Sequence, residues 1–126
     1  MFDIDNFKSI NDTYGHDIGD EVLKTLSNLT LGSIRATDFA SRWGGEEFMI
    51  LLPETSLADT ARIAENIRVA IESYKFEAIP TPITISLGVA DYKSDYKDKE
   101  EIIKNVDIAL YEAKHNGKNQ VVKYEK

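Results

Sequence analysis

The chain has 126 residues, of which 42% are hydrophobic, and a formal net charge of -7 at pH 7. This length suits one domain with a hydrophobic core, and the acidic balance argues against broad nucleic-acid or anionic-membrane binding, because a polyanion requires a basic surface. Cysteine is absent, which excludes disulfides and thiolate metal sites, and we expect a cytoplasmic location. The longest hydrophobic run, 48–52, cannot span a membrane, although a longer parent protein could be anchored in one.

Hydrophobic periodicity predicts a strand and two helices in the first part of the chain. Residues 1–5 are typical of the end of a buried strand, and Asp5 is expected to cap the helix that follows. Gly15 is the expected stop of that helix, and hydrophobic residues at helical spacing predict a second one. The two helices are expected over 6–14 and 17–34.

The clearest local pattern is a hairpin in the middle of the sequence. Residues 39–43 and 46–52 predict two strands, and the two glycines between them, Gly44 and Gly45, suit a tight turn with positive φ. We therefore expect the turn to consist of these two glycines.

The second half of the chain alternates helices and strands. Ser56 is expected to cap a helix over 57–74, and the alternation over 83–89 predicts a strand with one face on the core. Hydrophobic residues on one face of 102–113 predict a fourth helix, followed by a short strand over 120–124. The order β-α-α-β-β-α-β-α-β predicts an α+β domain with a central mixed, mainly antiparallel sheet covered by helices.

Acidic residues stand at two of the expected strand ends. Asp3 and Asp5 point to the same side if the first strand extends that far, and Glu46 opens a neighbouring strand. Such carboxylates suit a hard cation, because Mg²⁺ prefers a few carboxylates together with phosphate oxygens and water. Glu47 faces the opposite way and needs a different role. The competing interpretation is a solvated acidic rim in which Asp5 only caps the helix.

Other candidate ligand-binding residues each have a structural alternative. Gly44 and Gly45 allow a nucleotide to approach the backbone closely, but such pairs are common in hairpin turns. Asn11 and Asp20 can pair with the hydrogen-bonding edge of guanine or with their own backbone. Cations near the end of the last helix and beside the first helix suit either a triphosphate or a helix end. These cations are Lys114, Lys118 and Lys8.

Several blocks of the sequence resemble a single family. Residues 44–48, Gly-Gly-Glu-Glu-Phe, resemble the GGDEF or GGEEF signature of diguanylate cyclases. Further blocks are similar to that family at its usual spacing, and the resemblance runs from Asp3 to about Val122. These blocks are 3–8, 11–12, 15–16, 19–20, 86–90, 109–114 and 116–119.

The resemblance implies a fold similar to nucleotidyl cyclase and polymerase palm domains, and a reaction that condenses two GTP molecules into cyclic di-GMP and two pyrophosphates. It implies that Asp3, the Ile4 carbonyl and Glu46 hold Mg²⁺, with Mn²⁺ as the alternative ion. Glu46, helped by Glu47, would favour deprotonation of the attacking ribose 3′-hydroxyl. The implied substrate contacts are Phe7, Lys8, Asn11, Asp20, Gly44, Gly45, Lys114 and Lys118.

The family's regulation and assembly are implied in the same way. Each domain binds one GTP, so two copies must meet as an antiparallel homodimer, driven by an upstream sensory or receiver domain in a longer bacterial signalling protein. Arg35 and Asp38 resemble the family's inhibitory site for cyclic di-GMP, although an exposed pair at a helix end is the ordinary alternative. Asn66 stands where a second inhibitory arginine is often found.

The sequence also departs from the family pattern. Lys118 stands where many members have arginine, which keeps the charge but loses the planar fork. The family's opening helix and the beginning of its first strand have no counterpart in residues 1–126, which we interpret as a GGDEF-type domain without that block. We therefore expect exposed apolar surface, an unpaired edge and reduced stability.

Two alternatives to a cyclase remain open at this point. One is a non-catalytic regulatory domain that binds GTP, or binds cyclic di-GMP through Arg35 and Asp38. The other is a structural dimerisation fragment. Degenerate members of the family usually lose the signature acids, whereas Glu46 and Glu47 are present here, so the enzyme is the favoured hypothesis.

Overall fold

Five strands form one mixed sheet in the order β2-β3-β1-β4-β5. The computed structural model describes residues 1–125. All strand pairs are antiparallel except β4 and β5, which confirms the predicted element order and the mainly antiparallel sheet. The strands are β1 (Phe2–Ile4), β2 (Phe39–Gly44), β3 (Glu47–Leu51), β4 (Ile85–Val89) and β5 (Val121–Lys123), and the helices are α1 (Phe7–Tyr14), α2 (His16–Leu31), α3 (Leu57–Ser73) and α4 (Lys99–His115).

The ends of the helices agree with the predictions in part. Ser56 caps α3 by accepting a hydrogen bond from Asp59 N at 3.1 Å, as expected. The prediction that Asp5 caps the first helix is wrong, because Asn6 occupies that position with a left-handed φ of 58° and makes no side-chain cap. Helix α2 ends at Leu31, earlier than predicted, and Gly32 forms its C-cap.

The hairpin turn lies one residue later than predicted. Strand β2 continues through Gly44, which pairs with Glu47, so Gly45 and Glu46 form the turn. The register shifts around Trp43, and this irregularity moves Gly44 into the ladder. Of the two turn residues, Gly45 has a positive φ, at 46°, and Glu46 does not. Glu46 therefore projects from the turn instead of opening the strand.

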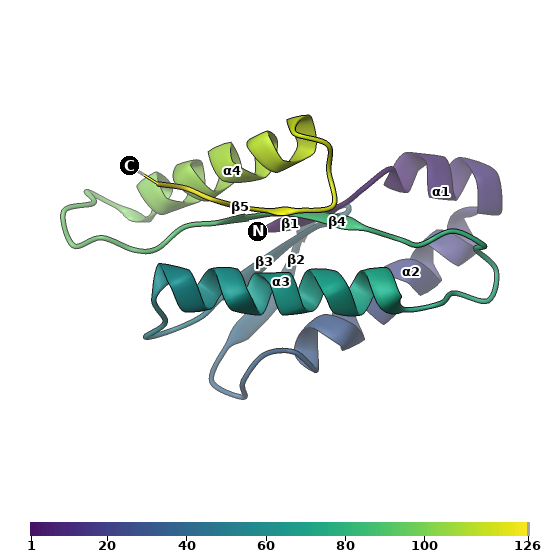
Figure 1. Ribbon diagram of the computed structural model, residues 1–126, viewed down its shortest axis with the longest axis horizontal. Coiled ribbons are helices and arrows are strands. Elements are labelled where there is room, and N and C mark those ends of the chain that lie inside the picture. Colours follow the sequence, from purple (N-terminus) through teal and green to yellow (C-terminus); the bar gives the residue numbers. More distant parts are fainter. Residues whose placement is uncertain (126) are drawn as a thin grey trace.

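Helices cover both faces of the sheet. In Figure 1, α3 lies on one side of the sheet and α4 on the other. The main core packs residues of β1 and β4, such as Phe2 and Leu87, against α2 and α3. Strand β4 is buried on both faces, so the expectation of a single core face was incomplete. Gly88 lies so close to α4 that a Cβ there would be 2.4 Å from Leu110 N.

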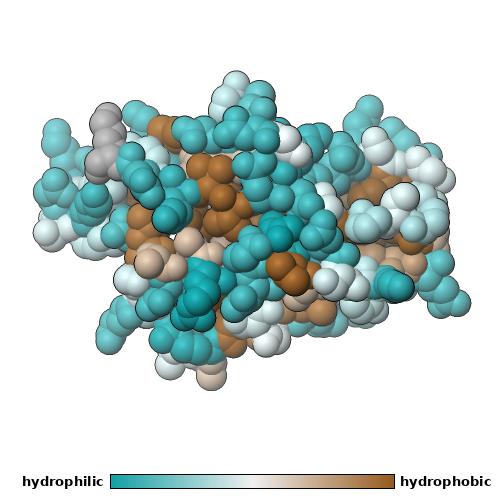
Figure 2. Space-filling view, in the orientation of Figure 1, coloured by the Kyte–Doolittle hydropathy of each residue, from teal (hydrophilic) through white to brown (hydrophobic). Residues whose placement is uncertain are grey.

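The half of the sheet formed by β2 and β3 is less well covered. Phe39, Trp43 and Leu51 are 64%, 52% and 59% exposed, and a cavity of about 990 Å³ is lined in part by Trp43 and Leu51. Figure 2 shows hydrophobic side chains at the surface between α3 and α4. Strand β1 pairs with β3 only through Phe2 and Asp3, and the residues of β3 beyond that pairing line the cavity. Apolar side chains are therefore exposed on this half of the sheet.

Within residues 1–125, no helix combines the length and hydrophobicity needed to cross a membrane.

Candidate active site

Two of the predicted acids meet where β1 lies beside the hairpin turn. Asp3 is 4% exposed and pairs across the sheet with Glu47, and Ile4 N donates a hydrogen bond of 3.4 Å to the carbonyl of Glu46. Partial burial raises the pKa of the Glu46 carboxyl, and the nearby carboxylate of Asp3 raises it further. These shifts indicate two carboxyl groups held close together, as a site for a positively charged group requires.

A lysine from α4 reaches the same pair of acids. Lys114 Nζ donates a hydrogen bond to Asp3 Oδ2. Burial lowers the pKa of Lys114, but the hydrogen bond from its ammonium to Asp3 and the charges of Glu47 and Glu46 outweigh that effect, so the net shift is upward. The other carboxylate oxygen, Asp3 Oδ1, is buried and has no hydrogen-bond partner among residues 1–125. This oxygen is available to a ligand or a metal ion.

The predicted guanine-binding residues lie on the neighbouring helices α1 and α2. Asn11 Oδ1 packs directly over Gly19, where an added Cβ would lie only 1.8 Å away, so the glycine leaves the space that this amide occupies. Asp20 follows Gly19 on α2 and is exposed. The structure therefore brings Asn11 close to the residue that precedes Asp20.

The two residues expected at the start of α1 differ in accessibility. Phe7 is 9% exposed and belongs to the core, so its side chain is not free to contact a substrate, and only its backbone remains as a candidate. Lys8 has a 93% exposed side chain with a 4.0 Å ion pair to Asp12 on the same helix. The ammonium of Lys8 is therefore mobile, and no contact holds it near Asp3 or Glu46.

The two C-terminal lysines, which were predicted near the end of the last helix, lie in different elements. Lys114 lies in α4, but the helix ends at His115 and Lys118 belongs to the segment that follows. Lys118 Nζ donates a hydrogen bond of 2.8 Å to Asn6 Oδ1 at the start of α1. The two ammonium groups therefore approach the β1–α1 connection from different elements.

Arg35 and Asp38 form a well-defined pair in the segment between α2 and β2. Arg35 donates to Asp38 through Nε at 3.2 Å and Nη2 at 2.9 Å, and also to Pro53 O and Thr55 Oγ1. The pair is not simply an exposed one, because the Asp38 side chain is fully buried while that of Arg35 is 54% exposed. The hydrogen bond from Arg35 holds the pKa of Asp38 below its ordinary value.

The sequence interpretation missed the role of Asp5. Its carboxylate accepts hydrogen bonds from Ser86 Oγ at 2.6 Å, Thr84 Oγ1 at 2.8 Å and Asn119 N at 3.0 Å. These partners lie 79 or more positions away in the chain, so no local pattern indicated them. Asp5 is a buried structural anchor next to the site.

Comparison with known proteins identifies the family. Residues 1–120 match the profile of the family described as "Diguanylate cyclase, GGDEF domain". The response regulator PleD of Caulobacter vibrioides is 43% identical over 126 residues, covering 97% of this chain and 28% of PleD. Diguanylate cyclase A of Treponema denticola is 43% identical over 123 residues, covering 96% of this chain and 33% of that protein. The chain thus spans a third or less of these relatives.

Solved structures agree with this assignment. The active GGEEF domain of a diguanylate cyclase from Vibrio cholerae has a TM-score of 0.95 and 40% identity, covering 99% of this chain and 80% of that one. The GGDEF domain of DgcB from Caulobacter crescentus, solved in complex with c-di-GMP, has a TM-score of 0.93 and 34% identity, covering 99% of this chain and 75% of that one. The chain therefore belongs to the GGDEF-domain family of diguanylate cyclases.

Proposed function

We propose that this chain is a diguanylate cyclase domain that joins two GTP molecules into cyclic di-GMP and releases two pyrophosphates. The observation that carries the proposal is the meeting of Asp3, Glu46 and Lys114 beside the hairpin turn, with one buried Asp3 oxygen left without a partner in the described chain. Two acids and one cation at one point suit a triphosphate with a divalent cation.

A resident Mg²⁺ ion, with Mn²⁺ as the alternative, fits these residues. Within residues 1–125 no cluster of three or more acidic, histidine or cysteine side chains stands ready to hold a metal. Mg²⁺ does not require one, because one or two carboxylates plus substrate phosphates and water complete its six ligands. Asp3, the Ile4 carbonyl and Glu46 are the proposed ligands. When bound, the ion would neutralise phosphate charge and stabilise the departing pyrophosphate.

The remaining residues bind and orient the nucleotide. Asp20 accepts hydrogen bonds from the ring N–H and exocyclic amine of guanine, and Asn11 adds its amide. Lys114 moves from Asp3 to the phosphates, and Lys118 joins it from the other side. The exposed turn at Gly45 leaves room for the nucleotide, because an added Cβ would meet nothing within 4 Å.

The reaction itself requires two copies of the chain. Each copy holds one GTP, and the two sites face each other across an antiparallel homodimer so that each ribose 3′-hydroxyl attacks the α-phosphate of the other nucleotide. Glu46, with help from Glu47, favours loss of the hydroxyl proton. Because the chain covers only 28% of PleD and 33% of cyclase A, we propose that a further domain of the parent protein controls this pairing.

Arg35 and Asp38 form the proposed inhibitory site for cyclic di-GMP. The guanidinium of Arg35 is half exposed but already forked onto a buried carboxylate, so its plane is fixed before a ligand arrives. A fixed guanidinium plane suits stacking on guanine. Calorimetric titration of the chain with cyclic di-GMP tests this site, and loss of binding in Arg35→Ala is the expected result.

The activity is tested by incubating the concentrated chain with GTP and Mg²⁺ and separating the products by chromatography. Cyclic di-GMP is expected, with a rate that falls more steeply than protein concentration on dilution. Glu46→Gln is expected to abolish it while GTP still binds. If the chain binds GTP or cyclic di-GMP at every concentration without forming product, the non-catalytic binding domain replaces the cyclase as its function.

A further inference from the structure

The segment after α4 has an unusual backbone. Gly117, Lys118 and Asn119 have successive φ values of 111°, 64° and 48°, all in the left-handed region. Glycine adopts this region freely and asparagine tolerates it, but lysine does so only when its surroundings hold it there. Local contacts hold part of this backbone, because the N–H of Lys118 donates to Ala113 O at 3.0 Å and its carbonyl accepts from Gln120 Nε2 at 3.1 Å. Contacts of the next residue, Asn119, tie the segment to the rest of the molecule.

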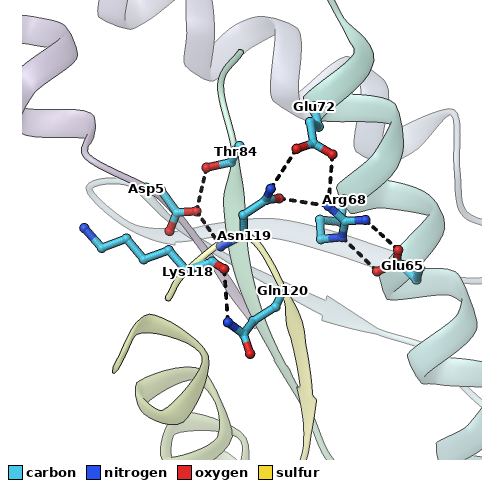
Figure 3. Close-up of polar contacts among 8 residues, drawn as sticks. All are labelled: Asp5, Glu65, Arg68, Glu72, Thr84, Lys118, Asn119 and Gln120. Carbon is cyan, nitrogen blue, oxygen red and sulfur yellow. Dashed lines mark hydrogen bonds and ion pairs between the residues drawn. The ribbon is translucent and has the colours of Figure 1, made fainter. Parts of the chain in front are cut away.

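Asn119 binds residues of α3 through both ends of its amide, as Figure 3 shows. Its Oδ1 accepts a hydrogen bond of 2.9 Å from Arg68 Nη1, and its Nδ2 donates one of 2.7 Å to Glu72 Oε2. A guanidinium only donates and an ionised carboxylate only accepts, so these two partners fix the orientation of the amide. The backbone N–H of Asn119 donates to Asp5 at 3.0 Å. We call Arg68, Glu72 and Asp5 the Asn119 clamp.

Each member of the Asn119 clamp is itself held firmly. Arg68 forks onto Glu65 with hydrogen bonds of 2.8 and 2.6 Å and donates to Glu72 at 3.1 Å, and its side chain is only 15% exposed. The hydrogen bond to Glu65 raises the pKa of Arg68, so its charge is permanent. Asp5 is 6% exposed and accepts hydrogen bonds from two hydroxyl groups, those of Ser86 in β4 and of Thr84 just before β4. The clamp thus ties the segment to α3 and to the centre of the sheet.

Lys118 receives its direction from this arrangement. With the backbone of Asn119 anchored, the Lys118 side chain extends to Asn6, where its ammonium lies 2.8 Å from Oδ1 at the start of α1. Lys118 has no ion pair of its own among the described residues. Its charge therefore remains available to an anion, and its place depends on the backbone that carries it.

We propose that Asn119, held by Arg68 and Glu72, is a positioning residue that keeps the Lys118 ammonium in place for the phosphates of bound GTP. This inference rests on the proposed function, because it takes Lys118 as a phosphate contact. Loosening the clamp frees the left-handed backbone to relax and carries the ammonium away, so nucleotide affinity falls although no contact residue has changed. Outer residues that orient a binding group typically change affinity by about tenfold or more when removed.

Calorimetry with one probe tests the proposal on the 126-residue chain. The probe is GTP with a methylene group in place of the oxygen between its α- and β-phosphates, added with Mg²⁺, since this analogue cannot release pyrophosphate. Arg68→Gln removes the guanidinium that donates to Asn119 Oδ1, and Asn119→Gly removes the amide but keeps a residue suited to positive φ. Arg62→Gln is the matched control, because Arg62 lies on the same helix in an exposed 3.4 Å pair with Asp59.

Both clamp variants are expected to bind the analogue about tenfold more weakly, and Arg62→Gln to bind as the native chain does. Combining Arg68→Gln with Lys118→Ala separates positioning from a general structural effect. If the clamp acts through Lys118, Arg68→Gln causes less than about a twofold further loss in the Lys118→Ala background. If Arg68→Gln does not fold, as thermal unfolding will reveal, Asn119→Gly carries the same comparison.

Two outcomes overturn the proposal while leaving the proposed function intact. One is native affinity in both clamp variants, and the other is an equal loss with and without Lys118, which would make the clamp merely structural. A native chain that does not bind the analogue at all overturns the proposed function, and this inference with it.

Discussion

Replacing Gly88 by alanine is expected to destabilise the chain because β4 and α4 leave no room for a methyl group. A Cβ at this position would lie 2.4 Å from Leu110 N and 2.5 Å from Val106 O, whereas ordinary contacts begin at 3.4 Å. Both obstructing atoms belong to the helix backbone and cannot rotate away. Helix α4 must therefore move by about 1 Å from a closely packed sheet.

The cost follows from the size of that displacement. Overpacking of this kind costs about 1–3 kcal/mol. With an unfolding entropy of about 2.1 cal/mol/K per residue, a chain of 126 residues loses about 4 °C in Tm for each kcal/mol. Calorimetry or circular dichroism should therefore record a Tm about 4–11 °C lower. Because Lys114 lies on α4 one turn after Leu110, the same shift should weaken its hydrogen bond with Asp3.

Gly32→Ala is the matched control for this experiment. Gly32 has a helical φ of -72°, and its added Cβ would lie 3.5 Å from Asn28 O, which is ordinary contact. Its Tm should stay within about 2 °C of the native value, because surface substitutions of this kind change stability by about 0.5 kcal/mol or less. A Gly88→Ala variant with the same Tm as Gly32→Ala would refute the packing argument for α4.

Three further predictions concern guanine recognition, pH and the exposed sheet. Gly19→Ala should displace the Asn11 amide, which can swing aside, so stability changes little while calorimetry shows about tenfold weaker GTP binding; unchanged affinity would remove Asn11 from the site. Asp38→Asn should be less stable than the native chain in urea titrations at neutral pH. The difference should vanish as pH falls through the lowered pKa of Asp38, because a carboxyl group with a lowered pKa gives its full stabilisation only above the ordinary value of 3.8 and loses it on protonation. A difference in stability that does not depend on pH would contradict this. The native chain should associate through its exposed apolar side chains, so that its mass measured by light scattering rises with concentration, and Trp43→Ser should weaken that rise. A native chain that is monomeric at all concentrations argues against association through this face.

Local patterns in the sequence were sufficient for the element order and for several element ends. Ser56 caps α3 and Gly15 ends α1 because these preferences act within one helical turn. The hydrophobic spacing of α2 and α3 identified most of the residues that bury against the sheet. The acids Asp3 and Glu46 were recognised as one candidate site from their strand-end positions and from the family resemblance.

The tertiary structure decided which of these polar groups meet, and what each one does. Asp5 was predicted to cap a helix, yet hydroxyls more than 75 positions away occupy its carboxylate. The hairpin turn moved to Gly45 and Glu46 because an irregularity around Trp43 changed the strand register. The hold of Arg68 on Asn119 joins residues 51 positions apart. Helix periods and caps depend on neighbours within a few residues, whereas register and buried hydrogen bonds depend on how the finished sheet and helices pack.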